Sequence, residues 1–235
     1  MAKQPQPFQK ILKAAQEAGF AESDPTLDID GWDSKFKLII TNFHAYGNLN
    51  QPADILNLGI RFIQPEDIQF AKNNNFIIKL LGKSNLTNGE LISYVAPQFI
   101  ANTQPITSIE YENNAVELNA NYANQQVFQG KGAGSIPTAS AVFSDVLAVS
   151  KNYTYDYVKA KQAKIKFNNE AILKVYISSH KKEEVDKVEL QTDLENESKK
   201  GFCYKVGNIS IASLKNQFEE QKPKVFICVF PNKIT

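Results

Sequence analysis

The carboxylates between residues 21 and 37 are the groups in this 235-residue chain whose types and spacing point most directly to chemistry. Five of them crowd this short stretch: Glu22, Asp24, Asp28, Asp30 and Asp33. Like charges repel one another at short range, so such a concentration is typical of a site that holds a cation or a polar substrate. Lys37 follows Asp33 by four residues, which is the spacing of neighbours on a helix surface. The segment therefore predicts a binding or acid–base site at the start of a helix.

The positions after the acidic run predict a helix from Trp32 to Gly47. Apolar residues recur there at helical intervals and predict one apolar stripe, which comprises Trp32, Phe36, Ile39, Ile40 and Phe43. Asp33 and Lys37 fall on a neighbouring stripe, with Asp33 at the positive N-terminal end of the helix dipole. A shorter amphipathic helix begins near Phe8 and ends at Gly19. The acidic loop is thus expected to lie between two helices.

Two other interpretations of the acidic run compete with a functional site. Asp33 and Lys37 fit an ordinary exposed pair, which stabilises a helix by a few tenths of a kcal/mol. The run Asp28–Gly31 also looks like the middle of a calcium loop. Placing Gly31 at the sixth position puts Thr26 at the first and Lys37 at the twelfth, where the loop needs an acid and a glutamate. The calcium interpretation therefore fails at both ends.

A glycine cluster between Gln129 and Val142 is the second candidate. Three glycines in five residues, Gly130, Gly132 and Gly134, allow the backbone to approach a ligand closely. A strand is expected before the cluster and a helix to about residue 150 after it, with Ser135 as the N-cap and Pro137 in the first turn. The dinucleotide fingerprint would need glycine at position 135. The alternative is a purely structural turn.

Both segments resemble elements of one enzyme family. The acidic run resembles the "AE-DP--D--G-D" substrate loop of homoserine dehydrogenases, and the glycine cluster resembles their "G-GAG--PTASAV--D" element. Looser matches lie between them, including residues 59–63 and 95–97. The two motifs stand in the family's order about a hundred residues apart, which makes the resemblance specific. It covers residues 8 to about 150 and does not extend further.

The resemblance implies NAD(P)-dependent interconversion of L-homoserine and L-aspartate 4-semialdehyde, in the aspartate route to threonine and methionine. Lys37 matches the family's proton donor, which serves the substrate hydroxyl, and Asp33 would orient it. Glu22 matches the family's ligand for the homoserine ammonium group, and Asp28 is expected to assist. We further expect Asp30 to be solvated.

The resemblance also implies a cofactor, NADP or NAD, with Gly132 and Gly134 reaching its nicotinamide end. In the family a nucleotide-binding domain precedes the acidic loop, and Met1 falls where the intervening helix should be. We therefore expect an N-terminally truncated chain, inactive as a dehydrogenase by itself. The family's sheet also implies a homodimer.

Composition narrows the function classes. Lys and Arg number 26 and Asp and Glu number 25, so no basic surface for nucleic acid is expected. No apolar run reaches the length of a membrane span and the N-terminus is too polar for a signal peptide, so a cytoplasmic protein is expected. Cys203 and Cys228 are expected to be free thiols, and His180 lacks neighbours that would indicate a metal site.

The strand and turn pattern predicts an α+β fold, a mixed or antiparallel sheet covered by helices. Strands are expected over residues 57–64, 76–81, 90–97, 106–111, 115–122, 125–129, 171–179, 202–211 and 224–230, and further helices over 65–72 and 213–221. We expect residues 1–160 to form a substrate and catalytic domain. Residues 161–235 should form a small α+β domain, a degenerate regulatory domain or a docking module.

A function from another class also fits the pattern. A non-catalytic amino-acid-binding or assembly subunit would keep the fold without the chemistry. The joint presence of Glu22, Asp33 and Lys37 argues against that alternative, since a protein without activity has no chemical need for all three.

Overall fold

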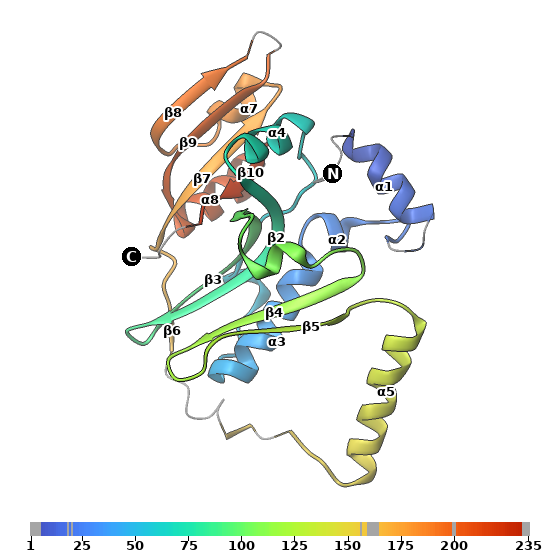
Figure 1. Ribbon diagram of the computed structural model, residues 1–235. Coiled ribbons are helices and arrows are strands. Elements are labelled where there is room, and N and C mark those ends of the chain that lie inside the picture. Colours follow the sequence, from blue (N-terminus) through green and yellow to red (C-terminus); the bar gives the residue numbers. More distant parts are fainter. Residues whose placement is uncertain are drawn as a thin grey trace.

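The computed structural model describes residues 6–17, 19, 21–155, 157–158, 165–198 and 201–231. Its centre is an eight-stranded mixed sheet (Figure 1). The strands run in the order β1-β3-β10-β7-β9-β8, and β2 and β6 also pair with β3. Their bounds are β1 Leu56–Asn57, β2 Phe76–Thr87, β3 Glu90–Ala101, β6 Lys166–Phe167, β7 Ile172–Ser179, β8 Gln191–Glu197, β9 Cys203–Ser210 and β10 Phe226–Val229. The α+β class expected from the sequence is confirmed.

Strands β2 and β3 form the longest element of the sheet, an antiparallel hairpin in register from Phe76–Ala101 to Thr87–Glu90. Its turn consists of Asn88 and Gly89, both with positive φ, 54° and 79°. Such an Asn-Gly pair matches the right-handed twist of the flanking strands. Strand β3 is buried along most of its length and pairs on its other edge with β1 and β10.

Helices cover both faces of this sheet. The helices are α1 Phe8–Glu17, α2 Thr26–Ile29, α3 Trp32–Tyr46, α4 Pro65–Asn73, α5 Ser135–Ser150, α7 Lys182–Asp186 and α8 Ile211–Gln221, with 3-10 turns at Pro52–Asp54 (η1) and Pro105–Ser108 (η2). Helices α7 and α8 pack on the face that carries Leu173, Val175 and Ile177. Helix α4 packs on the opposite face, against Phe99 and Tyr176. In the described ranges, no helix combines the length and the apolar character that crossing a bilayer requires.

Residues 172–229 fold as β7-α7-β8-β9-α8-β10. This βαββαβ unit joins the first part of the chain through the parallel pairing of β10 with β3. One hydrogen-bonded sheet therefore includes strands from both predicted domains. The expected boundary at residues 160 and 161 lies outside the described residues.

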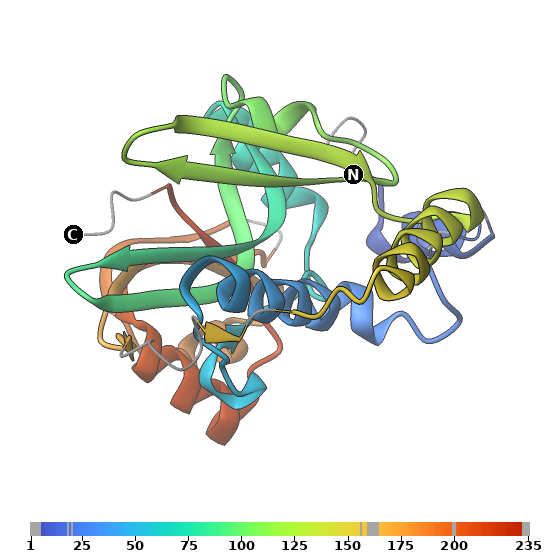
Figure 2. The same ribbon diagram turned by 90° about the horizontal axis from the view of Figure 1, so that it is seen from below.

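A separate arm leaves the sheet after η2. It consists of the two-stranded hairpin β4 (Asn113–Ala120) and β5 (Asn124–Lys131), followed by α5. In Figures 1 and 2 α5 stands apart from the sheet. No residue of β5 or α5 is buried, and Phe143, Val146 and Leu147 are among the exposed apolar side chains of α5.

Two of the strands expected from the sequence were wrong, and one strand was not expected. The strand expected over 106–111 is instead η2, because Pro105 starts a turn and the Thr107 and Ser108 hydroxyls donate to nearby carbonyls. Of the strand expected over 57–64 only Asn57 belongs to β1, since Ile60 N–H donates instead to the Ile29 carbonyl. The charged stretch 180–200 was not expected to hold a strand, yet it contains β8, a polar edge strand.

Candidate functional site

Helix α3 carries the predicted catalytic pair and has well-defined ends. Gly31 precedes it with φ of 81°, in the left-handed region that favours glycine. A Cβ at Gly31 would lie 2.7 Å from Asn57 Oδ1, so a side chain has no room there. Gly47 ends the helix with φ of 70°, and its N–H donates to the Phe43 carbonyl at 2.8 Å. The helix predicted from Trp32 to Gly47 is confirmed.

A polar side chain fixes α3 on the sheet. Asn42 is buried and accepts a hydrogen bond from Ser84 Oγ at 2.6 Å. Its amide donates to Ser93 Oγ at 3.0 Å and to Asn50 Oδ1 at 3.2 Å. These bonds join the helix to β2, to β3 and to the loop after Gly47. They set the rotation of the helix and hence the direction of its other side chains.

The buried face of α3 differs from the apolar stripe expected from the sequence. The helix buries Lys35, Leu38, Ile39 and Asn42. Of the expected stripe, only Ile39 is buried; Phe43 is half-buried, and the exposed members are Trp32, Phe36 and Ile40. The hydrogen bonds of Asn42 set the rotation of the helix, and in this rotation Trp32, Phe36 and Ile40 face outward.

Asp33 and Lys37 form the ion pair that their spacing predicted. Lys37 Nζ lies 2.7 Å from Asp33 Oδ2, and the two side chains are 54% and 49% exposed. An exposed pair of this kind contributes little to stability, typically less than about 1 kcal/mol. The arrangement holds an ammonium group at a fixed place on the surface of α3.

Asp28 and Glu22 lie in the same electrostatic environment as this pair. Burial is the largest cause that raises the pKa of Asp28, and the neighbouring charges of Asp33 and Glu22 raise it further. Lys37 acts in the opposite direction and lowers that pKa. The structure therefore brings together three carboxylates and one ammonium group, which we call the acidic cluster: Glu22, Asp28, Asp33 and Lys37.

The loop before α2, which carries Glu22, is anchored to α1 and to the first residue of α2. Gln16, on α1, donates its side-chain amide to the backbone carbonyls of Glu22 at 2.8 Å and Ser23 at 3.3 Å. Asp24 accepts hydrogen bonds from the N–H and the hydroxyl of Thr26, and these bonds lower its pKa. Asp24 thus shapes the turn into α2.

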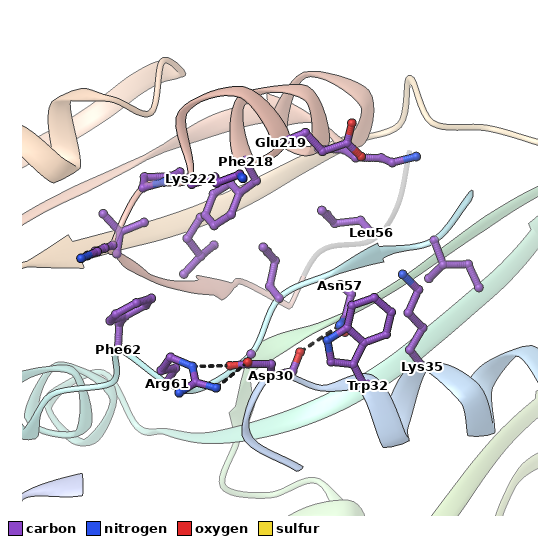
Figure 3. Close-up of a pocket in the computed structure, with 18 of the residues that line it drawn as sticks. Asp30, Trp32, Lys35, Leu56, Asn57, Arg61, Phe62, Phe218, Glu219 and Lys222 are labelled. Carbon is purple, nitrogen blue, oxygen red and sulfur yellow. Dashed lines mark hydrogen bonds and ion pairs between the residues drawn. The ribbon is translucent and has the colours of Figure 1, made fainter. Parts of the chain in front are cut away.

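Asp30 differs from the solvated carboxylate that was expected, because its side chain is only 29% exposed and is ion-paired. Arg61 binds it in a bidentate ion pair, with Nε at 2.8 Å from Oδ1 and Nη2 at 2.6 Å from Oδ2 (Figure 3). Asn57 also donates to the Asp30 carbonyl at 2.9 Å. These contacts clamp the end of α2 on the segment after β1. The only sequence signal for this segment was the family-like match of Gly59–Ile63.

The glycine cluster lies at the junction of β5 and α5, in the arm. Gly134 has φ of 114° and ψ of 157°, a conformation almost restricted to glycine. It is the N-cap of α5, so the expectation that Ser135 has this place was wrong; Ser135 is the first helical residue. Gly132 donates its N–H to the Glu112 carbonyl at 2.8 Å, and the Asn114 side chain occupies the place of a Cβ at Gly132.

The two predicted motifs therefore lie on different parts of the fold, the acidic cluster at the start of α3 and the glycine turn between β5 and α5. Within the described part of the chain, no hydrogen bond or ion pair joins the acidic cluster to the Gly132 and Gly134 turn. The same part of the chain contains no group of three or more His, Cys, Asp and Glu side chains that could hold a metal ion. The acidic cluster has the charge that a polar organic substrate with an ammonium group would need, and Lys37 places an ammonium group within it.

Comparison with known proteins gives the family. The homoserine dehydrogenase family model matches residues 1–147. The chain belongs to the homoserine dehydrogenase family. The family consists of oxidoreductases, and the resemblance inferred from the motifs is confirmed.

Individual homoserine dehydrogenases show how much of the chain is shared. That of Lactococcus lactis is 35% identical over 144 residues, which are 61% of this chain and 34% of the relative. That of Bacillus subtilis is 36% identical over 152 residues, which are 65% of this chain and 35% of the relative. The match thus spans about a third of the length of these relatives. A crystal structure from Thiobacillus denitrificans has the same fold, with a TM-score of 0.76 and 23% identity over 99% of this chain and 60% of that one.

Proposed function

We propose that these 235 residues carry the substrate-binding and proton-transfer part of a homoserine dehydrogenase, which interconverts L-homoserine and L-aspartate 4-semialdehyde. The observation that supports this most strongly is the acidic cluster at the start of α3, where Lys37 lies 2.7 Å from Asp33 and the charges of both act on Asp28, on α2. The family membership supplies the reaction class. The reaction belongs to the biosynthesis of threonine and methionine.

Lys37 has the role of proton donor and acceptor at the substrate hydroxyl. Oxidation of an alcohol requires loss of the hydroxyl proton as the hydride leaves, and reduction requires return of that proton to the developing alkoxide. An ammonium group held near the oxygen also stabilises the negative charge that develops there. Asp33 keeps the lysine side chain in position through its ion pair.

Glu22 and Asp28 have the role of binding the substrate amino group. Homoserine is a zwitterion, and its ammonium group requires carboxylate partners when it leaves water. Burial and the neighbouring carboxylates raise the pKa of Asp28, so a bound ammonium group would relieve this mutual repulsion. The cluster is then complementary to a cationic group on the substrate.

The cofactor role belongs to the glycine turn. Gly130 has open space where a Cβ would be and Gly134 adopts a glycine-restricted backbone, so the turn offers a bare backbone surface to a planar ring. NAD(P), when bound, exchanges the hydride with the substrate. An NAD(+)-dependent relative from Pseudomonas canavaninivorans is 30% identical over 148 residues, 63% of this chain and 42% of the relative. A mutant hyperthermophilic archaeal homoserine dehydrogenase was solved with NADPH, with a TM-score of 0.50 and 25% identity over 63% of this chain and 42% of that one.

Turnover also needs a phosphate-binding domain for the dinucleotide, and these 235 residues contain no such sequence. We therefore propose that they bind substrate but do not turn it over alone. The exposed apolar side chains of α5 support a further packing partner, either that domain or a second copy in a homodimer.

The proposal predicts a large effect of Lys37→Ala on turnover. In the active enzyme, with a nucleotide-binding domain present, kcat for homoserine oxidation should fall by about 100-fold or more, the usual contribution of a positioned acid or base. Lys13→Ala is the matched control, because Lys13 forms an i,i+4 pair with Glu17 on α1, with 3.9 Å between the charged atoms. The control should leave kcat unchanged. Steady-state kinetics decides the matter, and equal values of kcat for the two variants would refute the role of Lys37.

A further inference from the structure

A cavity of about 670 Å³ lies beside the acidic cluster without sharing any residue with it. Its walls come from the start of α3, from residues 52–62 and from the end of α8 with the following residues 222–227 (Figure 3). Its volume is in the range of small-molecule sites. The cavity therefore joins the catalytic part of the chain to the βαββαβ unit.

The charged side chains around this cavity are mainly cationic. Five cations, Lys35, Arg61, Lys215, Lys222 and Lys224, face two carboxylates, Asp30 and Glu219. Arg61 is bound to Asp30 in the bidentate pair described above. Four lysines and one glutamate then remain, so the lining has a clear excess of positive charge.

Lys35 is the most unusual of these lysines, because its residue is only 5% exposed. It lies two positions before Lys37, about 200° around the helix, and so faces away from the acidic cluster. Its Nζ lies 4.7 Å from the centre of the Trp32 ring, a cation–π contact. Among the described residues it forms no ion pair with a carboxylate within 4.0 Å. A buried cation without an anionic partner is costly.

A second lysine is fixed close to Lys35. The Lys215 ammonium group on α8 donates a hydrogen bond to the Ala53 carbonyl in the cavity wall. Burial lowers the pKa of Lys35 most, and Lys215 is the next cause, while Asp54 and Glu219 raise it. Two ammonium groups thus line one cavity, and their like charges repel each other. An anion between them would relieve both the repulsion and the desolvation.

The remaining wall of the cavity is mostly apolar, with Asn57 as its polar side chain. Leu56, Phe218 and Ile227 line it between the two chain segments, and Trp32 closes one side. Figure 3 shows Leu56 and Phe218 on the side of α8, opposite Trp32 and Lys35 on α3. Such a wall accepts an apolar body, whereas an inorganic ion would leave it uncovered.

We propose that this cavity is a binding site for a small organic anion, a carboxylate carried on an apolar body. The carboxylate lies between Lys35 and Lys215, and the body packs against Leu56 and Phe218. This site is separate from the substrate site and does not depend on the proposed dehydrogenase activity.

Trp32 reports on this site directly, because it lines the cavity and is the single tryptophan of the chain. The probe is 4-phenylbutanoate, and 4-phenylbutan-1-ol is the same body without the charge. Titration of the 235-residue chain should give a saturable change in tryptophan fluorescence with the carboxylate, at least about tenfold tighter than with the alcohol. Inorganic phosphate should bind at least as weakly as the alcohol.

Lys35→Met keeps the apolar stem and removes the charge, so the chain should fold with an unchanged or higher thermal midpoint. Measured by calorimetry, the affinity of this variant for 4-phenylbutanoate should be at least about tenfold lower, and its affinity for the alcohol should be unchanged. Lys215→Met should act in the same direction, and Lys13→Met, on exposed α1, should have no effect. Equal affinity for carboxylate and alcohol, phosphate binding as tight as the carboxylate, or unchanged carboxylate affinity in both cavity variants would overturn the proposal.

Discussion

The two family motifs of this chain lie in regions that are packed very differently. The acidic cluster is on a segment bound to the eight-stranded sheet by Asn42, Arg61 and the contact of Gly59 with Ile29. The glycine turn is on the β4-β5-α5 arm, in which β5 and α5 bury no residue. One motif therefore has its geometry fixed within these residues, whereas the described residues pack little against the other.

The buried carboxylate of Asp67 provides the largest expected effect. It accepts hydrogen bonds from Tyr176 and Ser178 at 2.9 and 2.5 Å and from the Gln64 N–H at 2.7 Å. Burial raises its pKa from 3.8 to about 6, against these hydrogen bonds. The fold therefore favours the protonated form. The stability that Asp67 contributes is fully present below about pH 4 and is lost as the pH rises to about 6.

Asp67→Asn should remove this pH dependence. The free energy of unfolding of the native chain, relative to the variant, should fall by up to about 3 kcal/mol between about pH 4 and pH 7. Urea denaturation at the two pH values measures it. Asp145→Asn, in exposed α5, is the control and should change stability little at either pH. A constant difference between native chain and Asp67→Asn would show that the packed region does not bind this proton.

Gly59→Ala tests the contact that holds the acidic segment on the sheet. A Cβ at position 59 would lie 2.3 Å from the Ile29 carbonyl oxygen and 2.4 Å from Asp30 Cα. Backbone atoms cannot move aside cheaply, so the free energy of unfolding should fall by about 1–3 kcal/mol. Urea denaturation measures it, with Gly130→Ala as control because that site has open space. Equal stability of the two variants would mean that the segment is not tightly packed there.

Gly134→Ala should have the smallest effect, although its backbone is the more restricted. An alanine at φ of 114° is strained by about 1–3 kcal/mol. The arm can relieve this strain by moving the start of α5, since no buried residue fixes that helix. Global unfolding should therefore change by less than about 0.5 kcal/mol. If the free energy of unfolding fell as much as in Gly59→Ala, the arm would unfold together with the sheet. The two regions would then not differ in how firmly they are packed.

Local signals explain which parts of the structure were predictable from the sequence. The limits of α3 follow from glycines at both ends and from a helical apolar period, all within 17 residues. Its buried face was not predictable, because Asn42 is anchored by Ser84 and Ser93, 42 and 51 residues away. The Asp33–Lys37 pair depends only on helical spacing, and it was predicted.

Longer-range partners explain most of what was missed. Arg61 neutralises Asp30 across 31 residues, and no local pattern pairs them. Lys35 was not recognised as a buried cation, since a lysine on an amphipathic helix is normally exposed and the cavity depends on α8, far along the chain. β8 was missed because its exposed residues lack an apolar alternation.

In the proposed function, the carboxylates of the acidic cluster bind the substrate amino group. 4-Hydroxybutanoate is homoserine without that group, so the two ligands separate the ammonium contact from the rest of the site. Calorimetry on the 235-residue chain should give tighter binding of L-homoserine than of 4-hydroxybutanoate. Glu22→Gln should lower the affinity for homoserine about tenfold, which is the effect of losing one charged hydrogen bond. It should change the affinity for 4-hydroxybutanoate by less than about twofold. Equal weakening of both ligands, or no change in homoserine affinity, would contradict the account.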